Sequence, residues 1–291
     1  MEPQCVPDGV IDKVNYVYKV YSMRIGRRFH FLVFALFLCL LIILTIGTEY
    51  MSAQSKIHAP DFPQGLDWLN AGRPLTMEEL RGKVVLLDFW TYCCINCMHV
   101  LPKLHDLEQK YGDALVVIGV HSAKFEEEGV TDNIRKAILR YEIEHPVVND
   151  REFQIWNEYG VHAWPTMVLI DPEGYIVAAQ SGEGAPEAFD PVIARLIKEY
   201  KAAGKLDTTP LELIMEREGE MPSVLSFPGK VTAAPDGERL FITDSNHNRI
   251  LIVSLPEGKI LEVIGGKSAG WEDGSFQEAK FNHPQGTELV G

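Results

Sequence analysis

A Cys-x-x-Cys motif at Cys94 and Cys97 constrains the fold of this chain more than any other feature. It closely follows an apolar run over residues 84–89, and the spacing of apolar residues over 98–111 predicts an amphipathic helix after it. This arrangement suits dithiol–disulfide chemistry, because a helix N-terminus stabilises a thiolate on the first cysteine. The second cysteine lies one helical turn further on, within reach of the first. The motif therefore predicts a redox-active pair.

Two residues outside the motif support this interpretation. Asp88 places an acid inside an otherwise apolar buried strand, which is costly unless the carboxyl group has a purpose. We expect it to exchange a proton with the Cys97 thiol, and the alternative is a carboxylate that is simply held by hydrogen bonds. Pro165 precedes another predicted strand, where a cis peptide bond in a tight turn is expected. The alternative for Pro165 is an ordinary proline at a strand entry.

A zinc site is the main competing hypothesis, because Cys-x-x-Cys also supplies half of many zinc sites. The chain has five cysteines and no second Cys-x-x-Cys pair, so neither a metal nor another cofactor is expected. Cys93 adds a third thiol directly before the pair, although adjacent cysteines form only strained disulfides. The acidic run Glu126-Glu127-Glu128 predicts a solvated loop.

Signals for strands and helices alternate from residue 83 onward. The predicted strands span residues 84–89, 114–120, 145–148, 166–170 and 175–179. The predicted helices span residues 98–111, 132–141, 151–159 and 191–203. A short helix over residues 76–82 is predicted from the capping-box spacing of Thr76 and Glu79. This alternation, with a hairpin and a helix at its end, indicates an α/β sheet with helices on both faces.

Asp88-Phe89-Trp90, Cys94-x-x-Cys97 and Trp164-Pro165-Thr166 together resemble the thioredoxin superfamily. The segment between Gly119 and Asp150 is similar to an insertion of its TlpA and peroxiredoxin-like branch, and the resemblance covers residues 60–203. It implies a thioredoxin-like fold in which the first cysteine attacks and the second resolves. The implied catalytic residues are Cys94, Cys97 and Asp88, and the implied substrate-binding residues are Pro165, Trp164 and Thr166. Ile95-Asn96 stands where thioredoxin has Gly-Pro, and this dipeptide helps to set the stability of the disulfide.

The N-terminal region predicts a membrane anchor. An apolar run over residues 29–47 approaches the length of about 20 residues that a spanning helix needs. A cleaved signal peptide, the alternative, has a shorter apolar core and a shorter leader. Basic residues in the tail, residues 1–28, predict that this tail is cytosolic and that the rest is lumenal or external. No Asn-x-Ser/Thr site occurs, so a domain on the cytosolic side stays an alternative.

The C-terminal region predicts short strands and turns without helices. Residues 48–204 form the predicted thioredoxin-like domain with its lead-in, and residues 205–226 form a linker. Four short strands with turn residues between them follow, at residues 230–232, 239–243, 250–254 and 259–264. They predict one blade of a β-propeller, and the stretch from Asp244 to Ile250 resembles NHL repeats. Because the pattern of a second blade only begins near Phe281, an incomplete propeller of a shortened chain is expected over residues 227–291.

The net charge of −14, without a basic stripe in the folded part, argues against nucleic acid as a partner. Two hypotheses about function remain. In the first, the chain is a membrane-tethered oxidoreductase that exchanges disulfides with the thiols and disulfides of protein substrates. In the second, it is a non-catalytic or redox-sensing protein that binds protein partners through the thioredoxin fold and the NHL segment.

Overall fold

The computed structural model describes residues 56–219 and 223–289. The predicted tail, residues 1–28, and the predicted membrane helix, residues 29–47, lie outside the described residues. Among the residues that are described, no helix combines the length and the apolar character needed to cross a membrane. One sheet and its helices form the α/β part, residues 58–219, and a second sheet forms the β part, residues 223–289.

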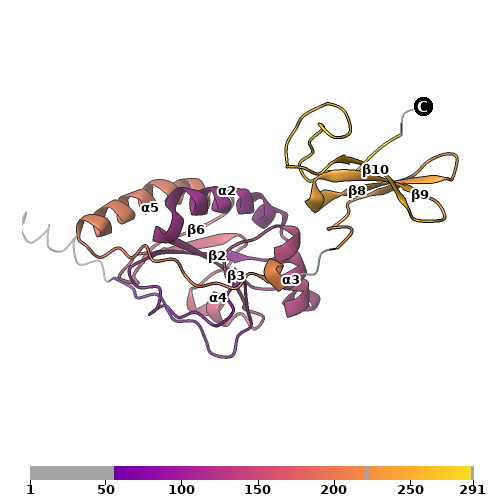
Figure 1. The fold of residues 1–291 in the computed structure, drawn as a ribbon. Coiled ribbons are helices and arrows are strands. Elements are labelled where there is room, and N and C mark those ends of the chain that lie inside the picture. Colours follow the sequence, from indigo (N-terminus) through magenta and orange to yellow (C-terminus); the bar gives the residue numbers. More distant parts are fainter. Residues whose placement is uncertain (1–55, 220–222, 290–291) are drawn as a thin grey trace, which may run out of the picture. The chain divides into compact units, whose positions relative to one another are not determined.

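A six-stranded sheet forms the centre of the α/β part (Figure 1). Its strands are β1 (Trp68–Leu69), β2 (Val84–Trp90), β3 (Leu115–His121), β4 (Val147–Asn149), β5 (Thr166–Ile170) and β6 (Ile176–Ser181). They lie in the order β1-β4-β3-β2-β5-β6. The three central strands β2, β3 and β4 are parallel, whereas β1, β5 and β6 pair in antiparallel fashion. The parallel strands are fully buried, as expected for a sheet covered on both faces.

Helices cover both faces of this sheet. They are α2 (Ile95–Tyr111), α3 (Thr131–Arg140), α4 (Gln154–Glu158) and α5 (Ala185–Ala202), with 3₁₀ turns at η1 (Gly112–Ala114), η2 (Glu126–Gly129) and η3 (Glu216–Gly219). One apolar cluster joins the sheet to α2 and α5, and Figure 1 shows these two helices side by side on one face. A second cluster joins the opposite face to α4 and to the lead-in before β2. The α/β sheet with helices on both faces that the sequence predicts is confirmed.

The side-chain alternation of β2 decides what faces the cysteines. Leu86 and Leu104 of α2 share one apolar cluster, whereas Leu87 belongs to the cluster on the opposite face. Because alternate residues of a strand share a face, Asp88 points to the same side as Leu86, towards α2. Asp88 lies opposite Gly119 of β3, so no side chain stands beside it on that strand.

The bounds of several predicted elements differ from the structure, and three of these differences have a visible cause. The residues of the predicted helix 76–82 form turns, although Thr76 and Glu79 do make the capping-box hydrogen bonds at 3.1 and 3.3 Å. Helix α4 is shorter than predicted, because Phe153 adopts a left-handed conformation with φ of 57° and Asp150 accepts hydrogen bonds from the first-turn amides. Helix α5 begins six residues earlier than predicted and contains Pro191, because burial of Phe189 against the sheet outweighs the missing amide.

The β part contains a four-stranded antiparallel sheet in the order β10-β9-β8-β7. Its strands are β7 (Val231–Ala233), β8 (Arg239–Asp244), β9 (Arg249–Ser254) and β10 (Ile260–Gly265). Each lies within one residue of its predicted position. A 3₁₀ turn, η4 (Ser245–His247), connects β8 and β9. The buried Asp244 accepts hydrogen bonds from Arg249 and His247 at 2.7 Å, so this polar stretch is held internally. That the sheet is a propeller blade stays a prediction.

Candidate redox site

Cys94 and Cys97 lie at the N-terminus of α2, where β2 delivers the chain. Cys94 is the N-cap residue, and its Sγ accepts a hydrogen bond from the Cys97 N–H at 3.3 Å. Its carbonyl oxygen accepts another from the Met98 N–H at 3.1 Å. Both cysteines carry free thiols and are buried, with exposed fractions of 5% for Cys94 and 0% for Cys97. A sulfur at an N-cap lies among the first-turn amides, which have no partner within the helix.

Asp88 is a buried acid whose charge acts on the Cys97 thiol. Its exposed fraction is 0%, and neither carboxylate oxygen has a hydrogen-bond partner within the described part of the chain. Burial raises the pKa of Asp88 to about 7, and the nearby His145 offsets only part of this rise. Burial also raises the pKa of the Cys97 thiol, and its hydrogen bond with Cys94 and the charge of Asp88 add to that effect. Asp88 can therefore change its protonation state near neutral pH beside a thiol that must lose a proton to react.

The predicted substrate-binding residues lie at the same edge of the sheet. Thr166 pairs with Phe89, so the Trp164–Pro165 segment lies beside the turn that carries the cysteines. The Trp164–Pro165 peptide bond is cis, as predicted. Trp164 packs against the cluster that contains both cysteines, and its Nε1 donates to the Ser122 carbonyl at 3.0 Å. The Thr166 hydroxyl donates to the Ala163 carbonyl at 2.7 Å, so its side chain is engaged internally. Roles in substrate binding stay predictions for all three residues.

Glu128 is a site residue that the sequence interpretation missed. The prediction that the run from Glu126 forms a solvated loop is wrong for Glu128, whose exposed fraction is only 2%. Its Oε2 accepts hydrogen bonds from the Thr91 hydroxyl at 2.8 Å and from the Lys124 N–H at 2.7 Å. Interaction with Glu128, followed by burial, raises the pKa of the exposed Cys93 thiol to about 11. Glu128 therefore keeps the third thiol protonated and unreactive at neutral pH.

Two buried histidines were also missed. His121 stacks against Tyr92 with ring centroids 5.4 Å apart and lies edge-on to Trp90 at 5.0 Å. Burial lowers the pKa of His121 to about 4, so its imidazole is neutral at physiological pH. His145 lies next to Glu108 of α2, with its Nδ1 3.3 Å from Oε1 of that glutamate, and its charge acts on Asp88. No local sequence signal marks either histidine, because their partners are distant in the chain.

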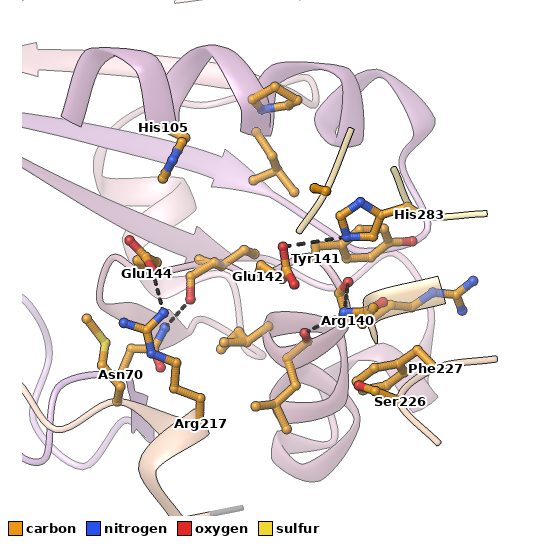
Figure 2. Close-up of a pocket in the computed structure, with 18 of the residues that line it drawn as sticks. Asn70, His105, Arg140, Tyr141, Glu142, Glu144, Arg217, Ser226, Phe227 and His283 are labelled. Atoms are coloured by element: carbon orange, nitrogen blue, oxygen red, sulfur yellow. Dashed lines mark hydrogen bonds and ion pairs between the residues drawn. The ribbon is translucent and has the colours of Figure 1, made fainter. Parts of the chain in front are cut away.

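A pocket lies beside α2, and Figure 2 shows His105 on its α2 wall. Asn70 donates to the Ile143 carbonyl at 2.7 Å and accepts from the Glu216 N–H at 2.9 Å. Arg217 points to Glu144 and forms an ion pair with it (Figure 2). These bonds hold the segment around η3 against the end of α3. The pocket wall also includes both His145 and its partner Glu108.

Comparison with known proteins agrees with this geometry. Residues 82–176 match a family model described as thioredoxin-like. NHL repeat-containing protein 2 of Gallus gallus is 46% identical over 241 residues, which cover 82% of this chain and 33% of that protein. Protein SUPPRESSOR OF QUENCHING 1, chloroplastic, of Arabidopsis thaliana is 47% identical over 239 residues, covering 81% of this chain and 23% of that protein. The chain thus spans a third or less of these relatives.

A shorter bacterial relative matches as well. The thiol-disulfide oxidoreductase ResA of Bacillus thuringiensis is 23% identical over 175 residues, covering 60% of this chain and 99% of that protein. The chain therefore carries a thioredoxin-like domain related to thiol-disulfide oxidoreductases. More narrowly, it is a close homologue of NHL repeat-containing protein 2. The match is 241 residues long and therefore cannot end within residues 1–219, so it includes some of the residues that follow the α/β part.

Proposed function

We propose that the chain is a thiol–disulfide oxidoreductase that exchanges disulfides with protein substrates through Cys94 and Cys97. The observation that carries this proposal is the buried, unpartnered Asp88 carboxylate facing the helix that starts with the two thiols. A purely structural dithiol has no need of a buried acid, whose ionised form is costly without a partner. Such perturbed acids next to nucleophiles are typical of functional sites.

The exchange has two steps. The Cys94 thiolate attacks one sulfur of a substrate disulfide, so that one substrate thiolate leaves, takes a proton from water and a mixed disulfide forms. The Cys97 thiol then passes its proton to the Asp88 carboxylate, and the resulting thiolate attacks the Cys94 sulfur. The second substrate thiolate leaves, so the substrate disulfide is reduced to two thiols and the Cys94–Cys97 pair is oxidised. The reverse sequence oxidises a substrate dithiol.

Substrate is proposed to bind along the edge formed by Trp164 and Pro165. This edge lies beside the cysteine turn, and Ile95 and Phe125 expose apolar surface near it, with exposed fractions of 66% and 65%. An apolar rim around a nearly buried sulfur suits an extended, unfolded segment of a protein better than a small thiol. Cys93 carries no step, because its thiol is held protonated by Glu128.

Trapping of the mixed disulfide tests the proposal. In the full chain with Cys93→Ser, the further change Cys97→Ser should leave Cys94 covalently bound to substrate proteins. The matched variant Cys94→Ser should capture none, and the unmodified chain should reduce insulin with a dithiol as electron source. An inactive unmodified chain together with an empty trap would reject the oxidoreductase and leave the partner-binding hypothesis.

The membrane tether is a separate proposal. Residues 29–47 are proposed to cross the membrane once, with a cytosolic N-terminus and the α/β part on the lumenal or external side. The proposal rests on the hydropathy of this segment and on the basic residues before it. Cys94 offers the test because its thiol is the proposed nucleophile, so the chain used has Cys5, Cys39 and Cys93 replaced by serine. In sealed cells or vesicles, a membrane-impermeant maleimide should label Cys94 only if the domain faces outward. Labelling that requires detergent would place the domain on the cytosolic side.

A further inference from the structure

A second pair of titratable groups lies behind Asp88. His145 is buried, and its Nδ1 lies 3.3 and 3.5 Å from the two carboxylate oxygens of Glu108. The other ring nitrogen, Nε2, is buried and has no hydrogen-bond partner among the described residues. The two oxygens of Asp88 share that condition. Three polar atoms without partners in one region of the core are unusual, because buried polar groups are nearly always paired.

The strand register places these groups near one another. Asp88 lies opposite Gly119, and the Gly119 N–H donates to the Pro146 carbonyl at 2.9 Å, one residue after His145. Because Gly119 has no side chain, nothing on β3 separates the carboxylate from the neighbouring segment. Electrostatics agrees, since His145 lowers the pKa of Asp88 while Asp88 raises that of His145.

We propose that His145 and Glu108 relay the proton that Asp88 takes from Cys97 out to solvent. This inference rests on the proposed function and adds a route that the resolving step needs, because a carboxyl group with an exposed fraction of 0% cannot return its proton to water directly. Glu108 is partly exposed, with a side-chain exposed fraction of 24%, and it lines the pocket of Figure 2 together with His145. The relay therefore ends at a water-accessible surface.

The proton transfers balance as follows. In its neutral form, His145 carries its proton on Nδ1, where the N–H donates a hydrogen bond to the Glu108 carboxylate, and it presents a free lone pair on Nε2. The protonated Asp88 gives its proton to Nε2, which regenerates the carboxylate and forms an imidazolium. The imidazolium passes its Nδ1 proton to Glu108, and Glu108 releases it to water. One proton leaves Cys97 and one proton reaches solvent, and no oxidant is needed beyond the substrate disulfide.

The pKa values support this order. Burial acts to lower the pKa of His145, but the charge and hydrogen bond of Glu108, with smaller contributions from Asp88 and Glu144, raise it overall. The pKa of Asp88 is about 7. A group whose pKa lies near neutral pH is suited to accept a proton and pass it on. Cys97, Glu108 and Glu144 are the other titratable groups that act on this pair.

A rapid-mixing experiment tests the relay on the full chain with Cys5, Cys39 and Cys93 replaced by serine. An excess of dithiobis-nitrobenzoate modifies Cys94 and releases one yellow thiolate. Attack by Cys97 then releases a second in a phase that is independent of reagent concentration. This second phase should accelerate as the pH rises through about 7. Its absence from the parent chain would reject the proposed function itself, and the relay with it.

Glu108→Gln is the decisive variant. It should slow the second phase about tenfold. This effect is smaller than that of removing a group that exchanges a proton with the reacting thiol directly. It should also move the pH midpoint upward, because loss of the Glu108 charge lowers the pKa of His145, and a His145 that is protonated less of the time stabilises the Asp88 carboxylate less. Glu108→Asp should keep most of the rate, and Asp106→Asn, an exposed carboxylate on the same helix, should change neither quantity. A Glu108→Gln chain with the parent rate and midpoint would overturn the relay.

Discussion

Replacement of Asp88 by asparagine should stabilise the fold at alkaline pH. Burial raises the pKa of Asp88 from 3.8 to about 7. Because the folded state holds the proton more tightly than the unfolded state, the group costs nothing below pH 3.8 and its full penalty applies above pH 7. A tenfold change in an ionisation constant corresponds to about 1.4 kcal/mol, so the full penalty is about 4 kcal/mol. Asp88→Asn removes the charge and keeps the shape.

Urea unfolding of the full chain at two pH values measures this penalty. At pH 5 the wild type already carries a penalty of about 1.7 kcal/mol, so the advantage of Asp88→Asn should grow by about 2.6 kcal/mol between pH 5 and pH 8. The exposed control Asp106→Asn should show no such growth. In parallel, the variant should lose the fast attack of Cys97 on the mixed disulfide. An advantage of equal size at both pH values would mean that Asp88 does not carry the cost of a buried charge.

Two further predictions concern other buried charges. Glu128→Gln should lower the pKa of the Cys93 thiol from about 11 towards its ordinary value of 9.0, and so raise its rate of alkylation by iodoacetamide at pH 8 by up to about a hundredfold, as measured by mass spectrometry. Lys83→Met should lower the free energy of unfolding by about 3 kcal/mol in urea titrations, because the buried Nζ donates to the carbonyls of Asp113, Asp207 and Thr209.

Each of these predictions has a matched control. Glu127→Gln removes an exposed neighbour of Glu128 and should leave the Cys93 rate unchanged. Equal reactivity of Cys93 in both variants would show that Glu128 does not hold its proton. Lys103→Met breaks a surface ion pair with Glu187 at 2.6 Å and should cost less than about 1 kcal/mol. A cost for Lys83→Met that is no larger would mean that the three carbonyls find other donors.

The part of the site that local patterns encode could be predicted from the sequence. An apolar strand that leads into Cys94-x-x-Cys97 determines which way Asp88 points, because strand alternation and helix start are both local properties. The cis bond at Pro165 could be predicted because a proline directly before a strand is also a local pattern. The four strands of the β part were placed within a residue each, because proline and glycine turns bound them.

The residues that complete the site depend on contacts between distant parts of the chain. Thr91 and Glu128 are 37 residues apart, and so are Glu108 and His145. Within its acidic run, Glu128 cannot be distinguished from a solvated glutamate by sequence. The adjacent residues do not show that a hydroxyl group and two backbone amides donate hydrogen bonds to its carboxylate. The prediction of a helix over residues 76–82 was wrong although its local signal was correct. The capping hydrogen bonds form, but no helical turn follows them.

The absence of a side chain at Gly119 leaves room for side chains of the two neighbouring strands. A Cβ atom there would stand 2.8 Å from Nε1 of Trp90 and 3.2 Å from Cγ2 of Val147. Trp90 is the last residue of β2, four positions before Cys94, so any larger residue at position 119 would have to displace the ring that ends the strand. The neighbouring strand therefore determines which residues position 119 tolerates. Homologous chains that have the cysteine pair should also have glycine at this position.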